Sequence, residues 1–377
     1  MTGKHQSSTH PPLLPTTEED TVNRLRLLRS RRVGVVTYRR LLAECGSPAN
    51  ALRALPKIAR EAGVSNYTVC PTGVVEAEIR AARSAGARLI IEGTPQYPAQ
   101  LGNIPDAPPL LWAIGRIELL RQPIVALVGA RNASSLGTRM AKRLADELTR
   151  AGYVVVSGLA RGIDTAAHIG SLDSGTIAVQ AGGVDVVYPA ENAQLTHDIG
   201  KKGLRLSEKP MGQQPQARHF PARNRIVSGL AQAVVVVEAA AKSGSLITAR
   251  NALDQSRDVL AVPGHPFDAR AAGCNQLIRD GATLVRSAED ILEALQPIPD
   301  AAPELPLMQP KASPQPLKTN AQLHDEVLRR LGPTPMAEDQ LLRDVTAPAT
   351  ALSDVLVDLE LDGKISRQAG GLLSRTV

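Results

Sequence analysis

Aromatic residues are scarce in this chain of 377 residues, which has one tryptophan, five tyrosines and two phenylalanines. Few rings are therefore present to stack on nucleic-acid bases, so a contact with a nucleic acid would be mainly ionic. Cysteines are also few, and Cys45, Cys70 and Cys274 lie far apart. An odd number at wide spacing indicates neither a disulfide framework nor a metal cluster, and we expect a reducing, cytoplasmic location.

Long apolar runs and familiar nucleotide motifs are missing as well. No stretch approaches the roughly 18 apolar residues of a membrane span, and the first residues show no signal-peptide core. The chain has no Walker G-x-x-x-x-G-K-[ST] run, and Gly129-Ala130-Arg131 does not continue as G-x-G-x-x-G. The histidines show no ligand spacing. We therefore expect no membrane partner, no metal and no cofactor.

The net charge of +6 is unevenly distributed. Residues 21–84 contain 12 basic and 4 acidic side chains, whereas residues 297–377 contain 8 basic and 11 acidic ones. A basic excess is compatible with a polyanionic partner. For residues 21–84, an auxiliary phosphate-contacting surface and an ordinary solvated helix face are equally supported.

Composition and periodicity divide the chain into five segments. They are a disordered tail (1–20), a module of short helices (21–84), a domain of alternating strands and helices (85–296), a proline-rich linker (297–320) and three helices followed by a hairpin (321–377). The alternation predicts an α/β fold with a doubly wound, mostly parallel sheet. The last segment has the pattern of a winged helix. Its third helix, expected over 348–361, is acidic, which favours a protein-contact or dimer role over DNA reading.

The most informative stretch runs from Ile124 to Gly137, with the sequence IVALVGARNASSLG. An apolar run that stops at a glycine, an arginine and small hydroxyl residues predicts a buried parallel strand feeding a helix, expected to begin at Thr138. The free N–H groups and the positive dipole end of such a helix form an anion site.

Similar glycines, hydroxyls and cations follow the other strands. The carboxyl ends of parallel strands share one edge of the sheet, so these loops are expected to form one phosphate-binding site. Its candidate residues are Gly129, Arg131, Ser134, Ser135, Ser157, Gly158, Gly162, Arg223, Asn224, Arg225, Lys242, Ser243, Gly244 and Ser245.

Some of these candidates lie at the predicted N-termini of two helices. Arg223 and Arg225 are expected in the first turn of a helix, where cations are electrostatically misplaced, which indicates an anion partner. A carboxylate such as Glu208 would explain one of them equally well. Ser245 is predicted to cap the helix that follows Lys242.

Catalytic groups are few. Asp164 and His168 are spaced as an acid–base pair on one helix, but a helix-start aspartate and a hydrogen-bonded histidine are the favoured interpretation. We expect no catalytic residues.

From residue 125 to 285 the chain resembles the DNA-processing protein A family, also called DprA or Smf. The resemblance rests on VGARNASSLG, VVSGLARGIDTAAHIGSL, FPARNRIVSGL and VVVVEAAAKSGSLITARNAL. It implies an extended Rossmann-like fold, with an N-terminal helical domain like a sterile alpha motif and a C-terminal winged-helix-like domain. It also implies a homodimer that binds single-stranded DNA, protects it and loads the RecA recombinase in natural transformation, without catalysis. By motif, its DNA contacts fall on Arg131, Arg223 and Lys242 among the candidates. At Ala190-Glu191, where some relatives have a basic residue, the chain departs from the family.

Two other functions stay open. Because Rossmann-like sheets often hold nucleotides, the same site would suit an enzyme acting on a free nucleotide or nucleoside phosphate. Alternatively, the protein would be a recombinase-loading adaptor in which DNA contact is secondary.

Overall fold

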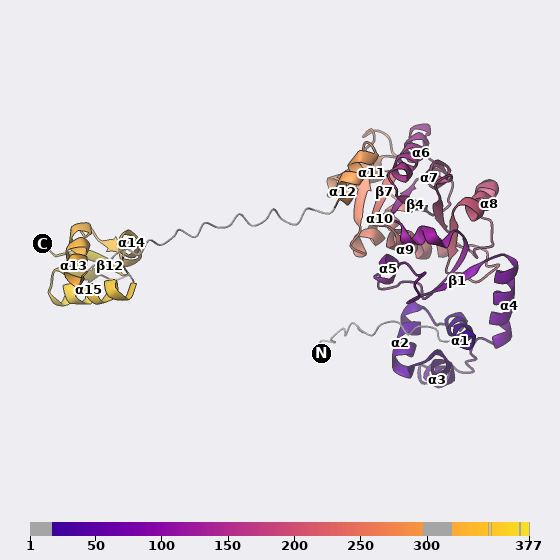
Figure 1. Cartoon of the computed structure of the whole chain (residues 1–377), viewed down its shortest axis with the longest axis horizontal. Helices are drawn as coiled ribbons and strands as arrows, with labels where there is room; N and C mark the ends of the chain where they lie inside the picture. Colours follow the sequence, from indigo (N-terminus) through magenta and orange to yellow (C-terminus); the bar gives the residue numbers. More distant parts are fainter. Residues whose placement is uncertain (1–16, 297–318, 346, 348, 369–370, 377) are drawn as a thin grey trace. The chain divides into compact units, whose positions relative to one another are not determined.

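The chain forms two units, residues Met1–Gln296 and Pro297–Val377 (Figure 1). The computed structural model describes residues 17–296, 319–345, 347, 349–368 and 371–376. Most of the expected N-terminal tail and of the expected proline-rich linker lies outside the described residues.

The first unit begins with four helices. They are α1 (Glu18–Arg29), α2 (Val35–Cys45), α3 (Pro48–Glu61) and α4 (Thr72–Ser84). Thr17 and Ser47 begin α1 and α3 because each side chain accepts a hydrogen bond from a backbone N–H of the first turn. Apolar residues at helical spacing, including Leu27, Leu41 and Leu55, face one another in a small core.

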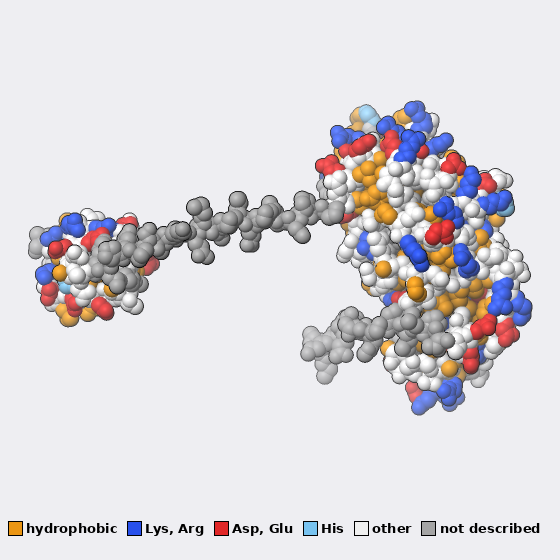
Figure 2. All heavy atoms as spheres, in the orientation of Figure 1, with side chains coloured by type: hydrophobic (Ala, Val, Ile, Leu, Met, Phe, Trp, Pro, Cys, Tyr) orange, Lys and Arg blue, Asp and Glu red, His pale blue; other side chains and the backbone are white. Residues whose placement is uncertain are grey.

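The arginines of these helices are largely engaged within the protein. Arg24 pairs with Asp20 at 2.7 Å, and the Arg29 guanidinium lies 2.8 Å from Glu78. Basic and acidic side chains are interspersed over the visible face of the helices (Figure 2). This arrangement favours a structural role for the arginines over a phosphate-contacting surface.

A nine-stranded sheet follows, in the order β1-β2-β6-β5-β4-β3-β7-β8-β9. Its strands are β1 (Arg88–Ile91), β2 (Leu110–Gly115), β3 (Ile124–Gly129), β4 (Val154–Ser157), β5 (Thr176–Val179), β6 (Leu204–Ser207), β7 (Ala233–Glu238), β8 (Asp258–Ala261) and β9 (Thr283–Leu284). The pairs from β6 to β9 are parallel, and β1 and β2 extend the β6 edge as antiparallel strands. The predicted α/β class and mostly parallel sheet are confirmed.

Helices cover both faces of the sheet (Figure 1). They are α5 (Ala99–Gly102), α6 (Ser135–Arg150), α7 (Ile163–Ser171), α8 (Ala193–Lys202), α9 (His219–Leu230), α10 (Ser245–Asp254), α11 (Ala272–Arg279) and α12 (Ala288–Leu295), with short 3-10 helices at Ile117–Arg121 and Ala190–Asn192. Strand β3 is buried on both faces of the sheet. Val125 and Leu127 pack with α6 and α7, whereas Ala126 and Val128 face the core that includes α9 and α10.

Several helix boundaries differ from the sequence-based expectation. Helix α6 begins at Ser135 rather than Thr138 because the Ser134 side chain accepts a hydrogen bond from the Gly137 N–H and so caps the helix earlier. Helix α9 begins at His219, so Arg223 and Arg225 lie beyond its first turn. Helix α11 was not expected.

The second unit has a separate three-stranded sheet and its own core. Its elements are α13 (Asn320–Arg330), β10 (Met336–Ala337), α14 (Glu338–Asp344), α15 (Ala349–Leu361), β11 (Ile365–Gln368) and β12 (Leu372–Arg375). The three helices and the hairpin match the winged-helix pattern, and β10 adds a strand that the sequence did not indicate. Within the described ranges, no helix is long and apolar enough to cross a membrane.

Candidate nucleic-acid interface

The strand order reverses at β3, because β4 to β6 continue on one side of it and β7 to β9 on the other. Open α/β sheets bind ligands at such a switch point, beyond the carboxyl ends of the strands. A cavity of about 890 Å³, which we call the strand-end groove, lies there. Its lining includes Gly129, Arg131, Gly158, Arg223, Asn224, Lys242, Ser243, Gly244 and Ser245 from the candidate set. The fold therefore gathers most of the predicted residues in one place.

Arg131 is an exposed cation of this groove. It follows β3, and its guanidinium carbon lies 4.8 Å from the centroid of the Phe220 ring. Phe220 in turn lies 5.6 Å from the ring of Tyr188, at a tilt of 50°. A cation over an aromatic face is held electrostatically, so the ring positions the guanidinium as well as offering a stacking surface.

The two aromatic residues extend the site beyond the strand-end groove. A further cavity of about 400 Å³ shares Arg131, Tyr188, Pro215 and Phe220 with it, and its remaining lining comes from the loops after β4 and β5. Neither ring was predicted from the sequence as part of the site. A usable signal existed, since Phe220 is one of only two phenylalanines and lies beside the predicted arginines.

Arg223 lies beneath the groove and is only 4% exposed. Its guanidinium donates to the carbonyl oxygens of Gly158 and Val179, at the ends of β4 and β5. A Cβ atom at Gly158 would overlap that guanidinium, so a larger residue there would displace the Arg223 side chain. Burial, together with the nearby Arg131 charge, lowers the pKa of Arg223 to about 10, although Asp164 opposes the shift. The side chain remains a cation at neutral pH and supplies positive charge from below.

Asp164 and His168 have structural partners. Asp164 accepts hydrogen bonds from the N–H groups of Gly158 (3.1 Å) and Ala160 (3.3 Å), which shapes the loop after β4. Burial raises the pKa of Asp164, and Arg223 counteracts that shift. The His168 Nδ1 atom lies 2.9 Å from the Thr176 hydroxyl, and burial lowers the pKa of His168 to about 3. The geometry favours the structural interpretation of this pair.

Some predicted residues hold the elements in place. Ser134 caps α6 and donates to a Glu238 carboxylate oxygen at 2.5 Å, while the buried Ser157 hydroxyl donates to the Leu127 carbonyl at 2.6 Å. Gly162 precedes α7 as its N-cap residue with a φ of 78°, a backbone conformation that favours glycine. Ser135, the first residue of α6, is exposed but does not line the groove.

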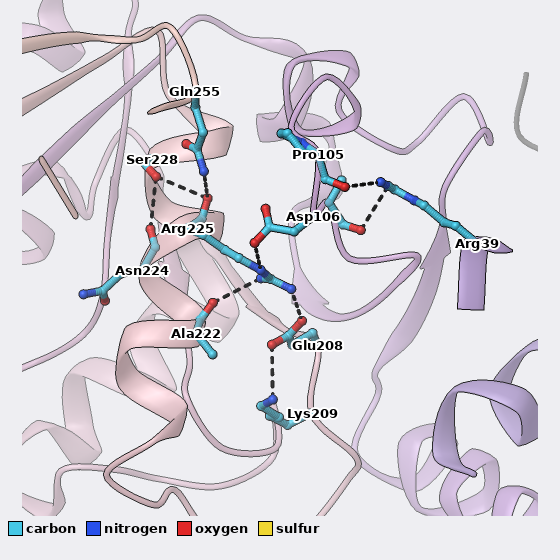
Figure 3. A network of polar contacts seen from close by, with 11 residues as sticks. Arg39, Pro105, Asp106, Glu208, Lys209, Ala222, Asn224, Arg225, Ser228 and Gln255 are labelled. Carbon is cyan, nitrogen blue, oxygen red and sulfur yellow. Dashed lines mark hydrogen bonds and ion pairs between the residues drawn. The ribbon is translucent and has the colours of Figure 1, made fainter. Parts of the chain in front are cut away.

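Arg225 faces away from the groove. It lies 2.7 Å from Glu208 and 3.0 Å from Asp106 (Figure 3). Of the two partners considered for Arg223 and Arg225, an anionic ligand or a protein carboxylate, Arg225 therefore has the carboxylate. Neighbouring Asn224 points away from this cluster (Figure 3). The expectation that Ser245 caps α10 was wrong. Gly244 occupies the cap position, and Ser245 is the first helical residue.

The remaining candidates form the wall that leads into α10. Lys242 is exposed, and the hydroxyls of Ser243 and Ser245 lie 2.7 Å apart. In the smaller cavity, Glu191 lies 3.5 Å from Arg161. The described residues include no group of three or more potential metal ligands.

Comparison with known proteins assigns families to three parts of the chain. Residues 88–296 match the model of DNA recombination-mediator protein A, residues 18–81 a DprA-like N-terminal HHH domain, and residues 310–371 a DprA winged helix domain. The DNA processing protein DprA of Streptococcus pneumoniae is 48% identical over 198 residues, which cover 52% of this chain and 70% of that protein. Protein Smf of Escherichia coli is 38% identical over 286 residues, covering 73% of this chain and 74% of the relative.

Two solved structures of DNA processing protein A are also similar to this chain. The crystal structure of the Streptococcus pneumoniae protein matches with a TM-score of 0.58 and 36% identity, over 73% of this chain and 93% of that one. DNA processing protein A from Helicobacter pylori, for which a single-stranded DNA binding mode is described, matches with a TM-score of 0.52 and 29% identity, over 55% of this chain and 95% of that one. The chain belongs to the DprA/Smf family of DNA processing proteins.

Proposed function

We propose that this protein binds single-stranded DNA in the strand-end groove, as a homodimer in the cytoplasm. In this proposal it protects the incoming strand and loads the RecA recombinase onto it, without catalysing a reaction. The observation that carries the proposal is the juxtaposition of the exposed Arg131 guanidinium with the Phe220 ring in one groove.

The groove offers charge suited to a phosphate backbone. Arg131 and Lys242 are exposed and have no carboxylate partner among the described residues. Arg223 adds buried positive charge below them. Cations that are not neutralised within the protein release counterions from DNA when they meet phosphates, which favours binding at low salt.

The aromatic rings of the groove supply a surface on which bases can stack. Phe220 and Tyr188 form a small aromatic surface beside Arg131, and stacking on such a surface tolerates any base. Binding is therefore expected to depend weakly on sequence. The Helicobacter pylori relative supports single-stranded DNA as the ligand. RecA loading and the homodimer rest on the family resemblance.

Fluorescence anisotropy with a labelled single-stranded oligomer tests the groove. We expect affinity to fall steeply with salt, and Arg131→Glu to weaken binding at least about tenfold for every sequence alike. Arg121→Glu is the matched control, because Arg121 is exposed and lines none of the cavities described here. Salt-insensitive binding, or unchanged affinity of Arg131→Glu, would refute the groove as the binding site.

The volume of the strand-end groove also suits a small ligand, so the nucleotide enzyme stays the second candidate. Calorimetry with mononucleotides beside an oligomer separates the two. Tight binding and turnover of a mononucleotide would favour the enzyme. The adaptor role is tested by whether the purified protein captures RecA when DNA is absent.

A further inference from the structure

A third cavity, of about 1130 Å³, lies along α6. We call it the α6 groove. Leu136, Arg139 and Lys142 of α6 line it, as does Ile169 of α7. The function proposed above makes no use of it.

The loop of residues 263–271, which follows β8, divides the α6 groove from the strand-end groove. Arg270 lines the strand-end groove, whereas His265 and Asp268 line the α6 groove. The side chains on the two walls of this loop are joined, because Arg270 forms two contacts of 3.1 Å with the Asp268 carboxylate. A ligand longer than one groove would therefore pass over this loop to reach the other.

The carboxylates of the α6 groove are already engaged. Asp146 lies 2.7 Å from Arg150, and Asp173 lies 2.8 Å from Lys202. Glu238 accepts from Ser134. In the first unit, basic and acidic side chains lie side by side over the region where Figure 1 labels α6 (Figure 2).

Two cations of the groove remain without such a partner. Arg143 pairs with Glu147 at 2.7 Å, but Arg139 and Lys142 have no carboxylate partner in the part of the chain that the structure describes. They lie three residues apart and both line the groove. The groove thus has positive charge available for an anionic ligand.

Phe267 projects from the dividing loop and is 95% exposed. The loop is well braced, since the Gly264 N–H and carbonyl bond both ends of the Asn275 amide at 3.1 and 2.9 Å. The Phe267 ring lies 5.6 Å from the His265 ring. A fully exposed phenylalanine on a braced loop forgoes the stability that its burial would give, which suits a residue that stacks on a ligand. Leu136, 73% exposed, adds apolar surface at the same groove.

We propose that the α6 groove is a second binding segment for the same single strand of DNA. The strand leaves the strand-end groove past Arg270, stacks a base on Phe267 and places its following phosphates beside Arg139 and Lys142. This inference rests on the proposed function, and it predicts a binding site longer than the strand-end groove alone can hold.

The test compares a short oligomer of about six nucleotides with one several times longer, both of thymidine. For the long oligomer we expect Phe267→Ala to weaken binding about 5- to 150-fold, the range that the loss of one stacked base gives. The double variant R139Q/K142Q should lower the salt slope by about 1.4, since each phosphate contact on a single strand contributes about 0.7. Neither change should affect the short oligomer.

Two further variants sharpen the result. The double variant R121Q/K201Q removes the same charge from exposed positions outside the three cavities and should bind as the wild type does. Phe267→Trp should retain affinity, and its fluorescence should be quenched by the long oligomer only. The single native tryptophan, Trp112, is buried and gives a constant background.

The outcomes separate this inference from the proposed function. A wild-type protein that binds neither oligomer refutes the function itself. If both oligomers bind but Phe267→Ala and R139Q/K142Q bind the long one normally, the second segment is refuted while the strand-end groove stands. If Phe267→Ala instead changes the sedimenting mass, Phe267 belongs to a contact between copies of the chain, which also overturns the inference.

Discussion

At the scale of single residues, three arginines that looked alike in the sequence have three different environments. Arg131 is exposed over the Phe220 ring. Arg223 is buried against two backbone carbonyls, and Arg225 is neutralised by two carboxylates. Only Arg131 of the three combines exposure with the absence of a carboxylate partner within the described ranges. A direct phosphate contact is therefore proposed for Arg131.

Residue-scale burial also predicts how stability depends on pH. Burial lowers the pKa of His168 to about 3, from an ordinary value near 6.5. The unfolded chain therefore binds a proton at this histidine between those values while the folded chain does not, so folding stability is complete above about pH 6.5 and falls as the pH decreases.

We expect the wild type to lose about 2 kcal/mol more unfolding free energy than His168→Gln between about pH 7 and about pH 5. Urea unfolding of both proteins at the two pH values measures the difference. The comparison with the variant cancels the contributions of other titrating groups, Asp164 included. Parallel losses in the two proteins would contradict the assigned pKa.

At the scale of elements, α9 connects the groove with the N-terminal helices. One side of α9 presents Phe220 to the groove, and the other directs Arg225 toward Glu208 and Asp106 (Figure 3). Arg39 of α2 contacts the loop that carries Asp106, donating to the Pro105 carbonyl at 2.6 Å. The orientation of α9, and with it the aromatic surface, thus depends on contacts far from the groove.

Loss of one carboxylate in this network should be costly. Although burial alone would raise it, Arg225 and Lys209 hold the pKa of Glu208 below its usual range. Glu208→Gln leaves the partly buried Arg225 guanidinium with Asp106 as its remaining carboxylate partner, and we expect a destabilisation of about 3 kcal/mol. Chemical denaturation measures it. The exposed pair of Arg40 and Glu44, 3.9 Å apart, provides the control, since Glu44→Gln should change stability by less than about 0.5 kcal/mol. Equal effects of the two variants would argue against the network.

At the scale of the whole molecule, each unit has its own apolar core. The second unit is built around Leu323, Leu356 and Leu373, and its described core cluster includes no residue of the first unit. All the residues assigned to the strand-end groove lie in the first unit. Folding of the first unit and its binding of DNA should therefore not require the second.

A protein ending at Gln296 is expected to unfold at the same denaturant concentration as the first unit of the full chain. It should also bind a single-stranded oligomer within about twofold of the full chain, because the phosphate and stacking contacts are all retained. Denaturation monitored at the single tryptophan, Trp112, reports on this unit alone. A large loss of affinity would show that the winged helix unit contributes to DNA binding, contrary to the role favoured by the acidic helix α15.

The sequence by itself determined the α/β class, the parallel strands and the loops that line the strand-end groove. Val125 and Leu127 alternate with Ala126 and Val128, so an uninterrupted apolar run predicts a strand buried on both faces. Glycines and cations after such strands must then meet at one edge of the sheet. These features depend on local periodicity and on chain topology, both of which are readable from one sequence.

Only the tertiary structure decided which side chains face the groove. Arg223 and Arg225 are two residues apart on α9 and therefore point to different sides of the helix, so one reaches the floor of the groove and the other reaches Glu208. Tyr188 and Phe220 meet because β5 and α9 are packed together, although 31 residues lie between them in the chain. Contacts of this kind depend on how distant elements pack, and no short-range pattern of residues specifies them.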